Sequence, residues 1–479
     1  MRRRESWHPL VRSSMPGVLV ALTLWLITFV RWRPGDYVRQ EMDALWQSAG
    51  RENLMSDPLG TLRVLHIQPP GMNALFAVDL AITPTNHALL LGVNLIAMIA
   101  TIVLIVDTVR RFGAPTWLST SSGIAYAVLP STVIYSQWAY SVSLIALLSV
   151  AAVWGIAVMR SSPNGGAIAS TSAIALAALT RPSYTTVLFL VWLIGVTVLL
   201  LRSRVRRRWI GLVGMGAAAA VVVAVQLHYL VSFGLPSMSS WTGENLAKAL
   251  RASQSLSVTE SARQEIAANP CRAQMLDAYE QDRLNRWDWQ TFRALPACSE
   301  IPPLPARGVA AWDVPTKGSS EIDNFVYSER LVSSREWTGM MTTIVRHDPW
   351  QLVRMAVTTD YGPRNSGIGL YLSPAEDYPF VSEIRDAHPL AVPLGMWSLL
   401  FPAFAWTLVI IGGAVAIIRR DSPLRTPVFA AGVLLASYHL AVNVLFEYSE
   451  NMRYRAEIDA VLMALAAMVV ASVVRAGPR

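Results

Sequence analysis

Four short polar stretches carry the acids, arginines and histidine that could do chemistry in this chain. The first follows the turn Pro34-Gly35, where Asp36, Gln40 and Asp43 share one face of any helix that continues from it, because they are four and three residues apart. A carboxylate at a membrane–water boundary is partly desolvated, which raises its pKa and suits it to act as a general base. Alternatively, Asp36 caps a helix and Asp43 is a solvated surface charge.

The next two stretches supply a histidine and an isolated arginine. His66 and Gln68 precede Pro69-Pro70, which predicts an extended entry into a helix. His66 could orient a substrate or a carboxylate, or it could be an ordinary hydrogen-bonded histidine. Arg181, in Leu179-Thr-Arg-Pro-Ser183, could bind a phosphate through two N–H groups. The alternative is that this arginine only reaches along the membrane interface to water.

The fourth stretch, Phe446–Arg455, is a short and densely charged turn between two apolar blocks. Ionisable groups held at a bilayer edge are functional candidates, although a turn of paired ions that only fixes topology would have the same composition. Together the four stretches offer a carboxylate base, a histidine and two arginine sites. That set suits transfer of a sugar from a lipid phosphate, which needs a base for the acceptor hydroxyl and cations for the departing phosphate.

Apolar blocks long enough to cross a bilayer separate these stretches. The chain has 479 residues, of which 53% are hydrophobic and 15% charged, whereas about a quarter are charged in a soluble protein. This composition excludes a soluble enzyme, a secreted disulfide scaffold and a disordered chain. We expect an all-α polytopic membrane protein with about ten spans, the first an uncleaved helix at Met15–Val30 and the others near 87–106, 117–135, 141–159, 166–180, 184–201, 209–232, 392–418, 427–447 and 456–474.

The basic residues predict the orientation of these spans. The net charge is +8, but the arginines lie in short clusters between the apolar blocks, so we expect no nucleic-acid partner. Placing Arg202–Arg208 and the similar clusters inside puts both termini in the cytoplasm. The predicted parts are then an N-terminal transmembrane module (1–231) with a first outer loop (31–86), a mainly helical extracytoplasmic domain (232–391) and C-terminal transmembrane helices (392–479).

Both cysteines, Cys271 and Cys298, fall in the predicted extracytoplasmic domain, where a disulfide is permitted. Geometry leaves two alternatives. If Cys271–Leu295 is one unbroken helix, its ends lie roughly 35–40 Å apart, too far for a bond that needs Cα atoms within about 7 Å. Either the helix breaks into a hairpin and the cysteines pair, or both are free, buried thiols.

The order of the four stretches on one side of the membrane resembles the GT-C superfamily of polytopic glycosyltransferases, of the protein-mannosyltransferase and aminoarabinose-transferase type. Gly35-Asp36-Tyr37 after the first span, His66-Ile-Gln-Pro-Pro70, Leu179-Thr-Arg-Pro-Ser183 and Asn451-Met-Arg-Tyr-Arg455 are similar to motifs of that family. The likeness covers about the first 200 residues and, more thinly, the last 50. The predicted extracytoplasmic domain matches nothing known to the family, and Tyr37 stands where the family often has a second acid.

The resemblance implies an outward-facing site that uses a polyprenyl-phosphate sugar as donor. Asp36 would be the catalytic base, with Asp43 as second candidate, and His66 would shape the acceptor side. Arg181, Arg453 and Arg455 would face the donor phosphate. A divalent cation, Mg²⁺ or Mn²⁺, is the one cofactor that the resemblance leaves open, with no metal ligands assigned. The residues expected to contact substrate from the same motifs are Tyr37, Gln68, Glu450 and Asn451.

The leading prediction is therefore a glycosyltransferase of a bacterial cell membrane that acts with inversion on an envelope glycan, lipid or protein acceptor. A transporter or flippase of a lipid-linked envelope precursor is the first alternative. Such proteins place polar groups near the bilayer midplane, whereas these spans read as apolar, with Asn94 and Gln226 as minor exceptions. A non-catalytic envelope assembly protein that binds through residues 240–385 is the second alternative.

Overall fold

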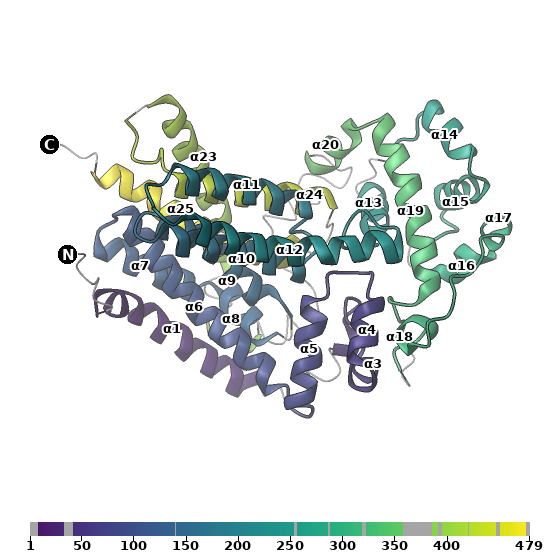
Figure 1. The fold of residues 1–479 in the computed structure, drawn as a ribbon, viewed down its shortest axis with the longest axis horizontal. Helices are drawn as coiled ribbons and strands as arrows, with labels where there is room; N and C mark the ends of the chain where they lie inside the picture. Colours follow the sequence, from purple (N-terminus) through teal and green to yellow (C-terminus); the bar gives the residue numbers. More distant parts are fainter. Residues whose placement is uncertain are drawn as a thin grey trace.

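The computed structural model describes residues 8–32, 42–138, 140–252, 256–285, 288–318, 322–357, 386–390, 395–419, 421–446 and 451–475. Across these ranges the regular elements are helices, with one isolated antiparallel bridge between Thr316 and Asp323. Asp36 and Glu450 lie outside the described residues, as does Tyr37. Figure 1 shows an elongated arrangement with both termini near the same end.

The long apolar helices run side by side in what we call the membrane bundle (Figure 1). Six helices among the described residues are long and apolar enough to cross a membrane by length and composition, which marks the chain as an integral membrane protein. The bundle consists of α1 (His8–Trp32), α6 (Ala88–Phe112), α7 (Thr116–Ala127), α8 (Pro130–Gln137), α9 (Val142–Val158), α10 (Pro163–Thr180), α11 (Thr186–Arg202), α12 (Arg208–Phe233), α23 (Gly395–Ile418), α24 (Pro427–Phe446) and α25 (Asn451–Arg475).

The remaining expected spans correspond to shorter helices. The block expected at 117–135 is broken, because Pro130 begins a new helix after Leu129 takes an extended conformation. Helices α9, α10 and α11 coincide with the blocks expected near 141–159, 166–180 and 184–201, but each has fewer than 19 residues. The count of about ten spans therefore stays a prediction for these shorter elements.

Small residues let the central helices approach closely. Helix α10 packs against α9 and α12, and α25 packs against α9 and α6 although it comes at the end of the chain. At the α9–α10 crossing, a Cβ atom added to Gly155 would lie 2.6 Å from the backbone nitrogen of Ser170, and one added to Gly166 would lie 2.5 Å from the carbonyl oxygen of Gly155. Only glycine fits both positions, as at many helix crossings in membranes.

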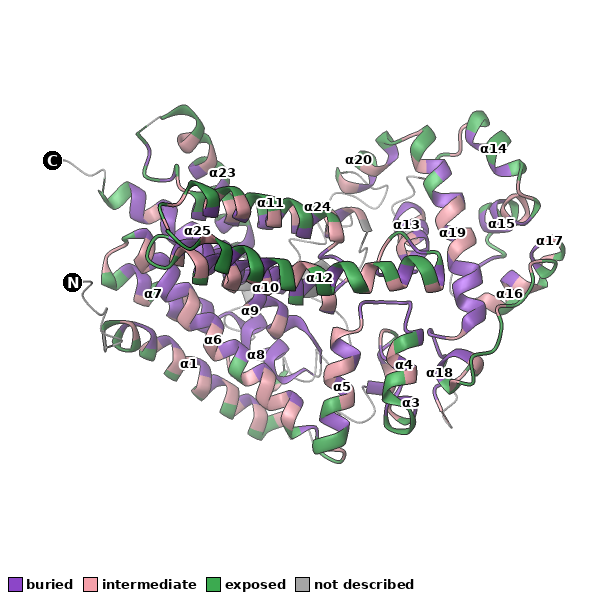
Figure 2. Cartoon of the chain, in the orientation of Figure 1, coloured by how far each residue is buried: buried purple, intermediate pink, exposed green. Residues whose placement is uncertain are grey.

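Burial separates a central helix of the bundle from a peripheral one. In the most apolar stretch of α25, 83% of the residues are buried, against 17% for α12. Figure 2 shows exposed residues along α11 and α12 and buried ones along α25. Helix α12 therefore presents its apolar side chains to lipid, whereas α25 is surrounded by protein.

Two groups of shorter helices lie beside the bundle (Figure 1). The group before α6 comprises α3 (Arg51–Ser56), α4 (Pro58–Val64) and α5 (Gly71–Ile82). What we call the inserted segment, residues 232–391, has a hydrophobic core of its own around Trp337 and Met340 of its longest helix. Its helices are α13 (Thr242–Ala252), α14 (Glu260–Ala267), α15 (Pro270–Glu280), α16 (Trp289–Ala294), α17 (Pro296–Ser299), α18 (Ala310–Asp313), α19 (Ser328–His347) and α20 (Trp350–Val357).

Of the two alternatives for Cys271 and Cys298, the structure has the broken helix and the disulfide. Helix α15 ends at Glu280, and Asp282 then takes a left-handed conformation with φ of 58°. Asp288 caps the start of α16 by accepting a hydrogen bond from the Thr291 backbone nitrogen. The chain therefore folds back, which brings the two cysteines into a disulfide with their Cα atoms 4.6 Å apart.

Candidate functional site

Arg181 ends α10 and turns its side chain into the protein. The backbone at Arg181 is extended, and Pro182 follows at once, so the helix cannot continue. The side chain is only 2% exposed, although an arginine that reached along the interface to water would stay accessible at its tip. Arg181 is therefore part of the interior of the bundle.

The guanidinium of Arg181 is bound by an acid from the far end of the chain. Its Nε donates to Oε1 of Glu457 at 2.7 Å, and its Nη2 lies 2.5 Å from the same oxygen. Its Nη1 donates to the hydroxyl of Tyr140 at 2.8 Å, and the group lies over the Tyr140 ring, 4.8 Å from the centroid. Because Glu457 is fully buried on α25, the pair neutralises both charges within the protein.

Helix α24 adds a histidine and an amide to the other side of Glu457. His439 Nε2 lies 3.4 Å from Glu457 Oε2, and Asn443 Nδ2 lies 2.7 Å from His439 Nδ1. All three side chains are buried. We call Arg181, Tyr140, Glu457, His439 and Asn443 the Arg181 network; it joins α10, α24 and α25 with Tyr140, which lies two residues before α9.

A groove of about 330 Å³ begins beside the Arg181 network. Pro182 and Ser183, the two residues after Arg181, form one wall, and Tyr438, the residue before His439, forms another. Ser183 is buried, and its hydroxyl has no hydrogen-bond partner within the described residues. The exposed surface of the groove is mainly apolar, although several of the remaining lining residues carry a hydroxyl or amide group. They come from the start of α11, from α24 and from the beginning of the inserted segment: Thr185, Thr186, Val187, Pro236, Ser237, Met238, Ser239, Thr242, Asn245 and Val442.

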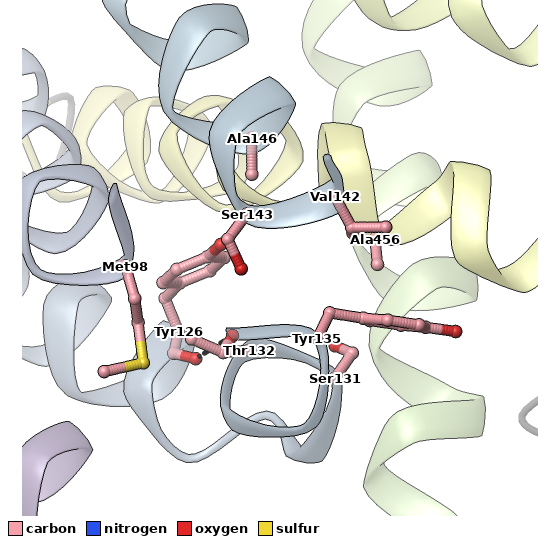
Figure 3. Close-up of a pocket in the computed structure, with 9 residues that line it drawn as sticks. All are labelled: Met98, Tyr126, Ser131, Thr132, Tyr135, Val142, Ser143, Ala146 and Ala456. Atoms are coloured by element: carbon pink, nitrogen blue, oxygen red, sulfur yellow. Dashed lines mark hydrogen bonds between the residues drawn. The ribbon is translucent and has the colours of Figure 1, made fainter. Parts of the chain in front are cut away.

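A second, much smaller cavity lies inside the bundle. Its volume is about 10 Å³, enough for roughly one water molecule. Hydroxyl groups of Tyr126, Thr132 and Ser143 are among its walls, and Figure 3 shows Ala456 of α25 across from Met98. Ala456, which directly precedes Glu457 in α25, is part of this lining.

The arginine turn at the start of α25 is partly described. Arg455 is 1% exposed, and its Nε lies 3.6 Å from Oδ1 of Asp459, one helical turn further on. Asn451 and Arg453 belong to the first turn of α25, but their side chains lie outside the described residues. Arg455, like Arg181, is thus held by an acid of α25.

Asp43 is engaged in local structure. Its Oδ1 accepts a hydrogen bond from the backbone nitrogen of Arg51 at 2.7 Å, at the start of α3. The ammonium of Lys317, from the inserted segment, donates to the carbonyl oxygens of Asp43 and Leu45 at 2.7 and 2.6 Å. Burial lowers the pKa of Lys317 from 10.5 to about 7. These contacts fasten the chain after residue 41 to the inserted segment.

His66 and Gln68 also form hydrogen bonds with residues far from them in the sequence. His66 is fully buried, with Nδ1 3.0 Å from the Ser240 hydroxyl and Nε2 3.1 Å from the Val326 carbonyl oxygen. Burial lowers the pKa of His66 to about 3, so the ring is neutral at physiological pH. Gln68 is buried too; its Nε2 donates to the Gln47 carbonyl oxygen at 2.7 Å, while its Oε1 has no partner within the described residues.

Among the described residues, the side-chain hydrogen bonds and ion pairs of the predicted site residues are made with residues that were not predicted, and none joins two predicted ones. An acid and an arginine from distant stretches do meet, but the acid is Glu457, which the sequence reasoning missed together with His439 and Tyr140. Glu457 and Asp459 lie near the start of α25, so the expectation that the spans are apolar through their centres is not contradicted by these two buried acids. Two acids so early in an apolar block were the signal that could have pointed to them.

No group of three or more His, Cys, Asp or Glu side chains that could hold a metal ion occurs in the described part of the chain. The sequence offers no metal-binding motif either. The divalent cation that the family resemblance leaves open therefore has no ligand set assigned from this chain.

The chain is similar to two solved structures but matches no protein family and no curated protein. Among solved structures, two crystal structures of ArnT from Cupriavidus metallidurans are similar: one in the apo state, at 14% identity with a TM-score of 0.32, and one bound to undecaprenyl phosphate, at 12% and 0.30. Each covers 95% of this chain, which covers 77% and 78% of theirs.

Proposed function

We propose that this chain is a membrane glycosyltransferase that moves a sugar from a polyprenyl-phosphate donor to an extracytoplasmic acceptor of the cell envelope. The observation that carries the proposal is the groove of about 330 Å³ that begins beside Arg181. A groove whose exposed surface is mainly apolar and whose lining also carries hydroxyl and amide groups suits an isoprenoid chain that ends in a phosphate. On the orientation predicted from the basic clusters, the groove lies at the outer ends of α10 and α12.

Asp36 is the proposed base. It would take the proton of the acceptor hydroxyl as that oxygen attacks the anomeric carbon, while the bond from that carbon to the phosphate oxygen breaks. The phosphate leaves with the bonding electron pair on the side opposite the attack, so a single displacement inverts the anomeric centre. Asp43 is the second candidate, and its use in holding Arg51 supports the choice of Asp36.

The arginines have the proposed role of stabilising the departing phosphate. Arg181 is already neutralised by Glu457, so a phosphate would have to compete with that carboxylate for the same N–H groups. Arg453 stays a candidate beside Arg455. His66 is now proposed as a positioning residue, since both of its ring nitrogens are occupied. Tyr37, Gln68, Glu450 and Asn451 keep their proposed role in substrate contact.

The test is incubation of the purified protein with a panel of polyprenyl-phosphate sugars, measuring transfer or slow hydrolysis. We expect Asp36→Asn to lower the rate by roughly 10²- to 10⁴-fold while folding and membrane insertion are unchanged. Asp277→Asn, on the exposed side of α15, is the matched control and should keep full activity. Full activity of Asp36→Asn with loss in Asp43→Asn would move the base to Asp43, and full activity of both would reject the proposal.

Buried charges in α25 favour a second candidate, a transporter or flippase of a lipid-linked envelope precursor. Intramembrane ionisable residues often mark transport pathways, and Arg455, Glu457 and Asp459 are all buried in one apolar helix. Reconstitution into liposomes with a labelled polyprenyl-phosphate sugar separates the two functions. Movement of the label across the bilayer without transfer to an acceptor would favour the transporter.

A further inference from the structure

Three arginines from separate elements gather at the end of α12. Arg335 of α19 donates through Nε to the carbonyl oxygen of Phe233, the last residue of α12, at 2.8 Å. Arg307, just before α18, donates through Nη2 to the carbonyl oxygen of Ser232 at 3.1 Å. Arg63 of α4 is brought to the same place because His228 of α12 is hydrogen-bonded to its carbonyl oxygen at 2.8 Å. We call Arg63, Arg307 and Arg335 the α12-end arginines.

Within the described residues, none of the α12-end arginines forms an ion pair with a carboxylate. The acids that influence them are engaged elsewhere: Asp313 accepts the backbone N–H groups of Arg307 and Val309, and Glu336 pairs with Arg272 at 2.8 Å. The pKa of Arg307 is lowered, mainly by burial and then by the positive charges of Arg63 and Arg335. The nearby carboxylates of Asp313 and Glu336 offset part of this repulsion by raising the pKa values of Arg307 and Arg335. Within the described residues, neither carboxylate forms an ion pair with these arginines, so the positive charges are only partly compensated.

Arg307 is nevertheless held in one place. Its guanidinium lies over the Trp312 ring, 4.1 Å from the centroid, and 5.5 Å from that of Phe233. Together with the bond to Ser232, this stacking fixes the plane of the group while its other N–H groups remain available, since the residue is exposed. Arg63 is exposed as well, and Arg335 is partly exposed. The charges are thus both positioned and accessible.

The α12-end arginines lie where the lipid-facing surface of the bundle stops. In the last two turns of α12, Leu227 and Leu230 are about half exposed and Val231 is 83% exposed. Leu59 of α4, on the same helix as Arg63, is 80% exposed. An apolar surface that ends at a row of cations is the arrangement expected at the level of lipid headgroups.

The positive charge of the α12-end arginines lies on the predicted outer side, where the positive-inside rule does not account for it. On the proposed orientation the end of α12 is extracytoplasmic, whereas the positive-inside rule accounts for the basic cluster at its other end, Arg202–Arg208. Topology therefore explains the arginines before α12 but not the three at its end. A resident anion would compensate them, and the fork of an arginine suits a phosphate in particular.

We infer that the α12-end arginines bind the phosphate of an anionic bilayer lipid, with its acyl chains along the exposed face of α12. The adjoining apolar surface favours a lipid over a free anion. The groove proposed for the donor also lies near the outer end of α12, but none of the three arginines is among its lining residues. The proposed lipid site can therefore be tested separately from the proposed glycosyltransferase activity.

The experiment titrates the purified, detergent-solubilised full chain with phosphatidylglycerol and counts bound lipids by native mass spectrometry. Phosphatidylcholine and inorganic phosphate are the comparison ligands. We expect each substitution among Arg63→Gln, Arg307→Gln and Arg335→Gln to weaken phosphatidylglycerol binding roughly fivefold, and the triple variant about a hundredfold, if each charge contributes as at other anionic membrane surfaces.

The control removes three arginines that lie elsewhere on the inserted segment. Arg263→Gln, Arg283→Gln and Arg354→Gln change the net charge equally and should leave binding unchanged. Arg63→Gln is the variant least able to disturb folding, since the side chain is exposed. Equal loss in the control triple variant, equal binding of phosphatidylcholine, or full competition by inorganic phosphate would each overturn the inference.

Discussion

The ends of α10 and α12 both carry arginine beside an aromatic ring, yet the two places treat the charge in opposite ways. At the end of α10, Arg181 is 2% exposed, lies over Tyr140 and is held by Glu457. At the end of α12, Arg307 is exposed, lies over Trp312 and has no carboxylate partner within the described residues. The ring is common to both, so burial and the acid make the difference.

The difference follows from the permanent positive charge of the arginine side chain. A guanidinium cannot lose its proton in a protein, so an arginine withdrawn from water must find a counter-charge or a dense set of acceptors. Glu457 of α25 supplies that charge to Arg181, and the ion pair then contributes to the stability of the bundle. An arginine that stays at the surface keeps its hydration and is free to bind a ligand. Three changes test this contrast, beginning with the largest effect.

Removing the acid from the buried pair should be the most damaging change. We expect Glu457→Leu to lower the free energy of unfolding by about 3–5 kcal/mol, because it leaves Arg181 buried and uncompensated. The double variant Arg181→Leu/Glu457→Leu should recover much of that loss, since no lone charge is left. The measurement is unfolding in detergent, with Glu280→Leu as a control that removes the partner of the partly exposed Arg263. Equal losses in the single and double variants would break the contrast.

Lys317 sharpens the contrast, because lysine can lose the proton that arginine keeps. It is 2% exposed and bound by carbonyl oxygens, and its pKa is about 7 in the folded chain against 10.5 ordinarily. Between these values the unfolded chain holds a proton that the folded one lacks, so stability rises with pH across that window. Below about pH 7 both states are protonated and the dependence stops.

The measurement compares urea unfolding of the wild type and Lys317→Met at about pH 6 and about pH 10. The wild type should gain stability relative to the variant as the pH rises. Parallel changes in the two proteins would show that Lys317 does not carry the dependence.

The smallest expected effect is at the end of α12. Arg307→Gln removes a stacked but solvent-accessible guanidinium, so the free energy of unfolding should change by less than about 1 kcal/mol. Arg181→Leu, measured in the same detergent, should cost several times more. If Arg307→Gln lowered the free energy of unfolding as much as Arg181→Leu, both arginines would be needed for the stability of the fold.

The apolar blocks predicted most of the helices, because a bilayer demands long apolar stretches and these are visible in sequence. Local chemistry was harder to read. Pro130 divides a predicted span, and the left-handed Asp282 reverses a predicted helix so that Cys271 and Cys298 can pair. Both residues were visible, but a single aspartate does not reveal that its backbone will turn.

The sequence predicted several residues of the candidate site, but it did not predict which side chains they contact. Arg181 was identified from its isolation beside Pro182, but Glu457 lies 276 residues away, and only the packing of α10 near α25 brings them together. His66 was identified from its neighbouring prolines, yet its partners Ser240 and Val326 come from the inserted segment. Contacts that depend on tertiary packing leave no local pattern in a single sequence.

The buried charges of α25 have a consequence for how the chain assembles. Arg455, Glu457 and Asp459 all lie near the start of this helix and are shielded by the surrounding protein. A lone α25 in lipid would expose them to hydrocarbon at a cost of about 2.5–3.5 kcal/mol for each charge near the bilayer centre and less towards its edge. Helix α25, which is synthesised after α10, should therefore settle only once α10 has presented Arg181. Biogenesis of the two halves is then coupled, and a chain truncated before α25 would leave Arg181 without its acid.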